Sequence, residues 1–205
     1  MKRILLCLAS LLLVFALCSC NEKTNNPADN SSGETNEIST LSPDDTKNDK
    51  TLVAYFSATG STKVIAEKIA KAENCELYEI IPEKEYTSSD LNWHDNGSRT
   101  TKEQNDKSAR PAIKSEKINI DNYKTIYIGF PIWWGEEPRI MDTFVESYNL
   151  SGKTVIPFST SGSSDISKAE TNLKQIANGG EWKNGKRFGA AAEDSEITSF
   201  IEEVK

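Results

Sequence analysis

A cluster of hydroxyl side chains around one glycine is the part of the sequence best suited to bind an anion. The apolar run 52–56 before the cluster predicts a buried strand, and the apolar spacing over 64–70 predicts a helix after it. A helix start presents free backbone N–H groups and the positive end of the helix dipole. We therefore expect a phosphate-type anion site with neutral donors only. Its residues are Ser57, Thr59, Gly60, Ser61 and Thr62.

This turn matches neither a P-loop nor a GxGxxG fingerprint. Its sequence, Ser-Ala-Thr-Gly-Ser-Thr over 57–62, resembles the (S/T)-x-T-G-x-T phosphate loop of the flavodoxin family, which follows the first strand. The resemblance implies flavin mononucleotide (FMN) as the cofactor, with its phosphate on the five residues named above. From the residues alone, a helix-cap cluster that binds nothing stays open, because Ser and Thr are favoured caps.

Two adjacent tryptophans occupy a second loop, at 129–135, after another predicted strand. A loop buries two indoles poorly, whereas a planar aromatic ligand can stack on them. Pro-Ile-Trp-Trp-Gly resembles the corresponding loop of a bacterial flavodoxin-like subfamily, as does a third loop at 158–163. The resemblance implies that both loops flank the flavin ring, with backbone N–H groups at its polar edge. The residues implied are Pro131, Ile132, Trp133, Trp134, Gly135, Ser159, Thr160, Ser161 and Gly162.

The third loop departs from the pattern of long-known flavodoxins, which place a tyrosine there on the outer face of the ring. Here the loop holds only small polar residues after its phenylalanine. Stacking then falls to Trp133 or Trp134, and the sequence does not decide between them. The other indole of the pair has a structural alternative, as a core residue against the following helix.

Predicted strands and helices alternate from Thr51 to the end of the chain, which indicates parallel βαβ units. The resemblance extends from Thr51 to about Val204. It implies an α/β, flavodoxin-like three-layer sandwich with helices on both faces of a five-stranded parallel sheet. Its order, 2-1-3-4-5, is that of flavodoxin, the standard example of FMN binding between strands 1 and 3. Strands are expected near 52–56, 75–80, 125–130, 153–158 and within 181–192, and later helices near 138–148, 164–177 and 195–204.

A long polar stretch, 82–122, interrupts the alternation and includes a weakly helical piece near 90–108. Its Tyr86, Trp93, His94 and Arg110 are chemically suited to hold or protonate a substrate. We interpret His94 as a solvated loop residue, assign no catalytic residue and expect no metal site. Cys75, at the start of a predicted strand, is interpreted as a buried inert thiol.

The N-terminus predicts export. Lys2 and Arg3 precede the apolar run 4–17, which is typical of a signal peptide and too short to span a bilayer comfortably. The end of the run resembles a bacterial lipobox, which implies cleavage after residue 19 and lipidation of Cys20. An ordinary signal peptide and an uncleaved anchor are the alternatives. Residues 20–50 are polar and predict a tether, so 51–205 is the predicted FMN-binding domain.

The formal net charge of −7, without a basic stripe, disfavours a nucleic-acid partner. The expected function is an FMN-binding redox protein of the bacterial cell envelope, anchored to a membrane surface by lipid, that transfers electrons to a redox partner protein. The first alternative is an FMN-dependent reductase of quinones or other small acceptors, with a pocket built by 82–122. The second is a flavin-free binding or scaffold lipoprotein, since fold does not fix function.

Overall fold

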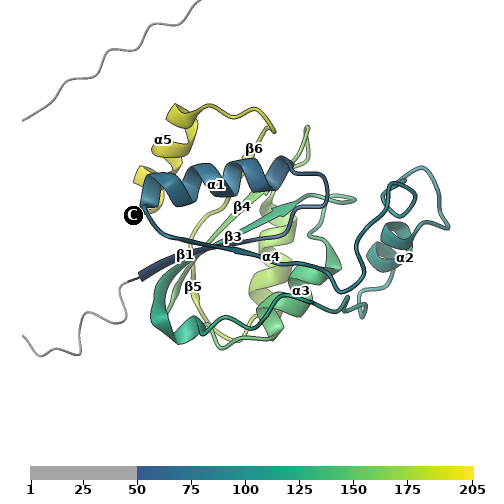
Figure 1. Ribbon diagram of the computed structural model, residues 1–205, viewed down its shortest axis with the longest axis horizontal. Coiled ribbons are helices and arrows are strands. Elements are labelled where there is room, and N and C mark those ends of the chain that lie inside the picture. The colour runs from purple at the N-terminus through teal and green to yellow at the C-terminus, as the bar shows by residue number, and fades with distance from the viewer. Residues whose placement is uncertain (1–49) are drawn as a thin grey trace, which may run out of the picture. The chain divides into compact units, whose positions relative to one another are not determined.

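Runs of β-branched and aromatic residues build one parallel sheet in the computed structural model, which describes residues 50–205 (Figure 1). The strand order is β2-β1-β3-β4-β5, and β6 also pairs with β4. The predicted parallel order 2-1-3-4-5 is confirmed. The strands are β1 (Lys50–Tyr55), β2 (Glu76–Glu79), β3 (Tyr123–Pro131), β4 (Thr154–Thr160), β5 (Glu181–Trp182) and β6 (Lys186–Phe188).

The N-terminal predictions fall outside the described residues. They are the signal peptide at 1–19, the lipidation of Cys20 and all of the tether but its last residue. That residue, Lys50, is the first residue of β1.

The fifth strand is broken into two short pieces along β4. Glu181 and Trp182 pair with the start of β4, and pairing resumes between Lys186 and Phe158. Pro157 lies in the interval on β4 and has no N–H to donate to a neighbouring strand. Gly185 passes against it, because a Cβ at that position would lie 2.8 Å from the proline Cγ. The predicted last strand is therefore present, but split opposite a proline.

Helices cover both faces of the sheet, which confirms the three-layer prediction (Figure 1). Helices α1 and α5 pack on one face, and α3 and α4 pack on the other. The short α2 belongs to the 82–122 stretch and lies beyond the end of the sheet (Figure 1). The helices are α1 (Ser61–Glu73), α2 (Arg99–Asn105), α3 (Arg139–Glu146), α4 (Ser167–Ile176) and α5 (Asp194–Val204), with a 3₁₀ turn at Ile120–Asn122.

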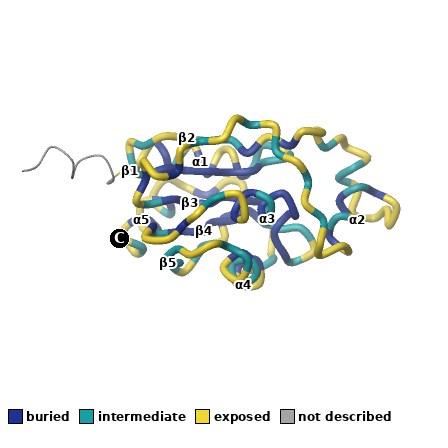
Figure 2. The backbone as a smooth tube through the Cα atoms, turned by 90° about the horizontal axis from the view of Figure 1, so that it is seen from below, coloured by how far each residue is buried: buried dark blue, intermediate teal, exposed yellow. Residues whose placement is uncertain are grey.

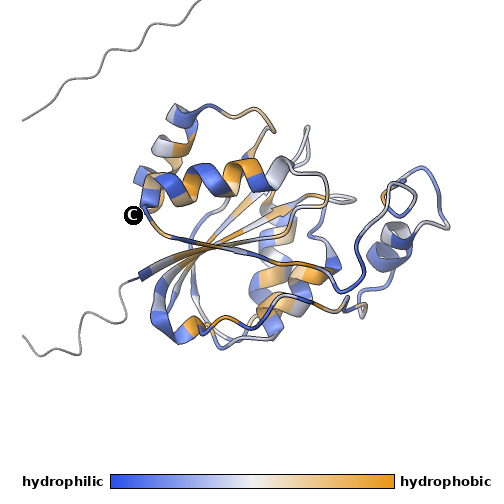
Figure 3. Ribbon diagram, viewed as in Figure 1, coloured by the Kyte–Doolittle hydropathy of each residue, from blue (hydrophilic) through white to orange (hydrophobic). Residues whose placement is uncertain are grey.

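Alternating residues of the central strands supply two separate cores. Along β1, Leu52 and Ala54 face α3 and α4, whereas Val53 and Tyr55 face α1 and α5. Figure 2 shows these central strands as the most buried part of the chain, and Figure 3 shows apolar residues along the strands and on α1 and α3. Packing is tight, since a Cβ at Gly129 would lie 2.1 Å from the ring of Phe158. A rigid sheet covered on both faces fixes where its loops begin.

Local hydrogen bonds make two helices shorter than the sequence predicts. Only 99–105 of the expected 90–108 piece is helical, because Ser98 caps it by accepting from the N–H of Thr101. Helix α4 begins at Ser167 rather than at 164. There the Ser161 hydroxyl accepts from the N–H of Ser164, and the Asp165 carboxylate accepts from that of Ser167, so the chain first forms a turn.

A buried ionic cluster fixes the loop between β3 and α3. The guanidinium of Arg139 is 3% exposed, with Nη2 2.6 Å from Glu136 Oε2 and Nη1 3.0 Å from Glu137 Oε1. Asp142 Oδ2 lies 3.6 Å from the same Nη1, and Asn172 donates to both oxygens of Glu137. Removing one member would leave a buried charge without its partner, at a cost of about 3–5 kcal/mol. The cluster therefore holds the loop rigidly against α3 and α4.

Two acidic members of this cluster hold their protons more tightly than usual. Burial raises the pKa of Glu137 to about 7, and the charge of Asp142 adds to the rise. Burial also raises the pKa of Asp142, against the attraction of Arg139 and Arg110. The ionic cluster is therefore the part of the core that is most sensitive to pH near neutrality.

Burial also raises the pKa of the Cys75 thiol, to about 11. The side chain is partly rather than fully buried, and a neutral thiol agrees with the inert role that we expected.

No helix within residues 50–205 combines the length and apolar character needed to cross a membrane.

The cluster predicts that stability falls with rising pH. The folded-state pKa of Glu137 lies above the ordinary 4.5, so between about pH 4.5 and 7 the folded protein binds a proton that the unfolded chain has released. The free energy of unfolding should therefore decline over this range by about 1–3 kcal/mol. The free energy of unfolding can be measured with urea at pH 5 and pH 8. Glu137→Gln should reduce the difference between the two values, whereas Glu202→Gln on the exposed side of α5 should leave it unchanged. Equal slopes for wild type and E137Q would contradict the assignment.

Candidate functional site

The three loops that the sequence singled out meet at the carboxyl edge of the sheet. The hydroxyls of Thr62 and Thr160 lie 2.7 Å apart and join the first loop to the third. The N–H of Ile132 donates to the carbonyl of Thr160 at 3.0 Å and joins the second loop to the third. Parallel strands end at the same edge, which is why residues about a hundred positions apart become neighbours.

The first loop ends in a helix start that lacks a side-chain cap. Gly60 is the N-cap, with φ +92°, a left-handed conformation that glycine adopts without steric cost, and its N–H donates to the Ser57 hydroxyl at 3.1 Å. Within the described chain, the N–H groups of Ser61, Thr62 and Lys63 have no acceptor, and the first turn of α1 contains no acidic residue. These orphan donors and the helix dipole make this helix start suited to an anion.

The threonine pair provides one further donor. Thr62 and Thr160 are almost fully buried, at 1% and 5% exposure. Each hydroxyl has one proton and two acceptor lone pairs, and only one of the two protons is used in their mutual bond. One O–H therefore remains for a ligand oxygen at this corner.

The tryptophan loop is a tight two-residue hairpin. Trp133 and Glu136 exchange two backbone hydrogen bonds, both of 2.9 Å. Trp134 and Gly135 between them have φ of +52° and +79°, as a type I′ turn requires. Positive φ costs a tryptophan about 1–3 kcal/mol, and such strain is most often found at functional sites.

This turn separates the two indoles into different roles. Trp133 is partly buried and packs edge-to-face on Phe56 and Tyr86, at centroid distances of 5.6 and 5.3 Å. Trp134 has no such ring contact in the described part of the chain and is 45% exposed. The structural role that the sequence left open thus belongs to Trp133, although its partners are the end of β1 and the 82–122 stretch rather than the following helix. Trp134 is left available to a ligand.

Only some of the expected backbone donors around the ring site are available. The N–H groups of Ile132, Trp133 and Ser161 already donate to carbonyls of the protein. Within residues 50–205, those of Trp134, Gly135 and Gly162 have no acceptor. The polar edge of a ring held here would therefore meet these three.

The third loop is small and internally bonded. The Ser161 hydroxyl accepts from the N–H groups of Ser163 and Ser164, and the Ser161 N–H donates to the carbonyl of Phe188. Ser159 is fully buried, and its hydroxyl has no hydrogen-bond partner in the described chain. Pro131 and Pro157 lie in the adjoining strands, so the loop begins from a stiff frame.

The 82–122 stretch reaches the site through a residue that the sequence did not single out. Gln104, in α2, donates to the carbonyls of Trp133 and Glu137 at 2.9 and 3.1 Å. Tyr86 donates to Glu103, and the guanidinium of Arg99 lies 4.0 Å from the Tyr86 ring centroid. Nothing in the sequence distinguishes Gln104 from other polar residues of this stretch, because its role depends on long-range contacts.

Two other residues that the sequence singled out in this stretch, Arg110 and His94, have their partners outside the three loops. Arg110 forms an ion pair with Glu146, with Nε 2.7 Å from Oε2. His94 is exposed, as we expected, and its ring lies against that of Trp93. Within residues 50–205, no group of three His, Cys, Asp or Glu side chains is placed to hold a metal ion.

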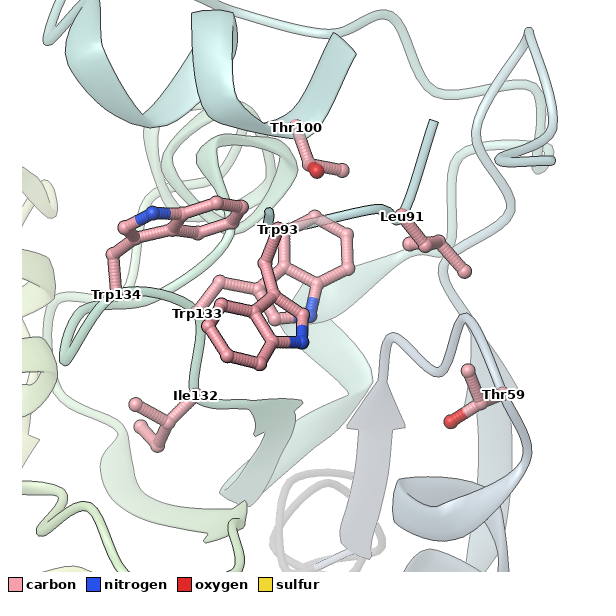
Figure 4. Close-up of a pocket in the computed structure, with 7 residues that line it drawn as sticks. All are labelled: Thr59, Leu91, Trp93, Thr100, Ile132, Trp133 and Trp134. Atoms are coloured by element: carbon pink, nitrogen blue, oxygen red, sulfur yellow. The ribbon is translucent and has the colours of Figure 1, made fainter. Parts of the chain in front are cut away.

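A cavity of about 290 Å³ opens between the hairpin and the 82–122 stretch (Figure 4). Its walls are mostly apolar and come from three parts of the chain. The lining residues are Thr59, Leu91, Trp93, Thr100, Ile132, Trp133 and Trp134.

Comparison with known proteins agrees with this geometry. The protein-family model for flavodoxin matches residues 50–204. The chain is similar to a Bacteroides uniformis protein named provisionally as a flavoprotein, with 49% identity and a TM-score of 0.73 over 76% of this chain and 99% of that one. It is also similar to a Bacteroides eggerthii protein with the same provisional name, with 46% identity and a TM-score of 0.71 over 76% of this chain and 97% of that one. No curated protein matches the chain.

A more distant relative has been solved with a ligand. A Lactobacillus acidophilus flavoprotein in complex with FMN shares 25% identity at a TM-score of 0.59, over 75% of this chain and 99% of that one. The Bacteroides and Lactobacillus matches cover nearly the full length of these proteins, and the family model spans almost all of the described residues. The chain belongs to the flavodoxin family.

Proposed function

We propose that the protein binds FMN at the carboxyl edge of its sheet and transfers electrons through the flavin. The observation that carries the proposal is the uncapped start of α1, which follows β1 and lies beside the tryptophan hairpin that follows β3. These strands flank the reversal of the sheet, the position at which flavodoxin, the standard example, binds FMN. Family membership and the FMN complex of the Lactobacillus acidophilus flavoprotein support the choice of cofactor.

The chain's own groups fit the phosphate of FMN. The orphan N–H groups of Ser61, Thr62 and Lys63 would bind its oxygens, and the hydroxyls of Thr59 and Ser61 would add donors. Because these donors are fixed by the helix, binding requires little ordering of the loop.

The fit extends to the ring. The exposed indole of Trp134 offers it a face, and the free N–H groups of Trp134, Gly135 and Gly162 offer donors to its polar edge. When bound, the flavin supplies the redox chemistry, while the protein orients it and sets its electrostatic surroundings.

We further propose that the protein works at the bacterial cell envelope, anchored by a lipid on Cys20. The proposal is supported by the lipobox-like end of the apolar N-terminal run and by the polar residues that separate it from β1. The electron donor and acceptor would then be envelope components. A second candidate, reduction of a small acceptor, is favoured by the apolar cavity beside the hairpin.

Adding a negative charge at the start of α1 should separate cofactor binding from stability. Ser61→Asp should stabilise the helix by about 0.3–1 kcal/mol through the dipole. The same carboxylate should repel the phosphate and weaken FMN binding by about tenfold or more, measured by titration of apoprotein. Ser195→Asp makes the same change in the first turn of α5 and should leave FMN affinity unchanged. If S61D binds FMN as tightly as wild type, the phosphate does not lie at this helix start.

One-electron transfer should be visible in the potentials of the bound flavin. Because the protein is acidic, adding the second electron should be disfavoured, and a potentiometric titration should resolve two waves, the second below that of free FMN. Added salt should raise the second potential by screening exposed charges. A single two-electron wave near that of free FMN would contradict an electron-carrier role.

A further inference from the structure

Both exposed tryptophans of the described chain line the same cavity. Trp93 is 64% exposed and Trp134 is 45% exposed, and their indoles stand on its walls with that of Trp133 (Figure 4). Leaving two large apolar side chains in water is unfavourable, and such surfaces mark binding sites when they lie together. A ligand between them would remove both from water.

The cavity shares Thr59 and the hairpin with the proposed flavin site and extends from them toward the 82–122 stretch instead of the third loop. Thr59 of the first loop and the hairpin line it, whereas none of the third-loop residues 159–162 does. Its remaining wall comes from Leu91, Trp93 and Thr100 of the 82–122 stretch. A molecule in the cavity would therefore adjoin a flavin held by the three loops.

The part of this wall that Thr100 and α2 form is held in place by hydrogen bonds within the protein. Thr100 donates through both its hydroxyl and its N–H to the carbonyl of Asp90, at 2.6 and 3.2 Å. Ser98 caps α2, and Gln104 ties that helix to the carbonyl of Trp133. A preformed wall costs little entropy on binding.

The lining specifies the chemical class of the occupant. No charged side chain lines the cavity, so a phosphate or carboxylate would find no partner there. The Thr100 hydroxyl proton is already donated and the Thr59 hydroxyl is assigned to the FMN phosphate, which leaves the indole N–H groups of Trp93, Trp133 and Trp134 as side-chain donors among the described residues. At about 290 Å³ the cavity is near the lower end of the roughly 300–1,000 Å³ of ligand pockets. Such a space accepts one planar apolar molecule with acceptor oxygens at its edge.

We propose that this cavity binds a planar acceptor of the quinone class between Trp93 and Trp134, next to the flavin. The inference rests on the proposed function only for the presence of a flavin beside the cavity, because the walls of the cavity are all formed by the protein. It gives the 82–122 stretch a role in selecting the electron acceptor.

The test is calorimetric titration of 2-methyl-1,4-naphthoquinone into oxidised, FMN-saturated protein, so that no electrons are transferred during binding. Trp93→Ala should weaken quinone binding by about tenfold or more and leave FMN affinity unchanged, and Trp93→Phe should recover most of it. Leu77→Ala, which removes an exposed apolar side chain from the remote strand β2, is the matched control and should have no effect. An unchanged melting temperature for W93A would establish that the fold is intact.

Three results would overturn the proposal. They are the absence of quinone binding to wild type, equal binding to W93A, and a parallel loss of FMN affinity in W93A, which would mean that the cavity holds the flavin ring itself. If wild type fails to bind FMN, the proposed function fails instead. The quinone titration of FMN-free protein would then still test the cavity.

Discussion

The edge-to-face contact among Phe56, Tyr86 and Trp133 is the interaction on which the rest of the site depends. It joins the end of β1, the 82–122 stretch and the hairpin after β3. With Trp133 held there and its carbonyl bonded to Gln104, the two-residue turn must present Trp134 to solvent. The buried Arg139 cluster holds the other end of the same loop. The hairpin can therefore bear a strained, exposed tryptophan because both of its ends are rigid.

Around this hairpin, polar groups without partners gather where strands end. The start of α1 keeps unpaired N–H groups, Trp134 and Gly135 keep theirs, and the Ser159 hydroxyl is buried without a partner in the described chain. A buried donor without a partner costs free energy, whereas an exposed one is hydrated, and a ligand with anionic and carbonyl oxygens would offer acceptors to both kinds. The proposed phosphate site and the proposed ring site thus have the same physical origin. Both consist of donors that find no acceptor within the described chain where the parallel strands end.

The sequence predicted the features that depend on local pattern. Apolar periodicity predicted the alternating strands and helices, and the resemblance to the flavodoxin family implied the sheet order 2-1-3-4-5 with helices on both faces. The structure confirms both. The split of the fifth strand was not predicted, since it depends on Pro157 of the neighbouring strand. The different roles of Trp133 and Trp134 were not predicted, because they depend on the positive φ of the turn. The role of Gln104 was not predicted either, because it depends on a hydrogen bond to a residue 29 positions away. The roles of the candidate residues toward a cofactor remain predictions.

The central claim, an FMN site whose phosphate rests on the start of α1, is tested most directly by comparing FMN with riboflavin. The two ligands share the ring and differ in the phosphate. Titrated into residues 50–205, which contain both cores, FMN should bind with one molecule per chain. Riboflavin should bind at least about tenfold more weakly, because the orphan donors of α1 would stay unpaired. Equal affinities, or no binding of FMN, would contradict the account.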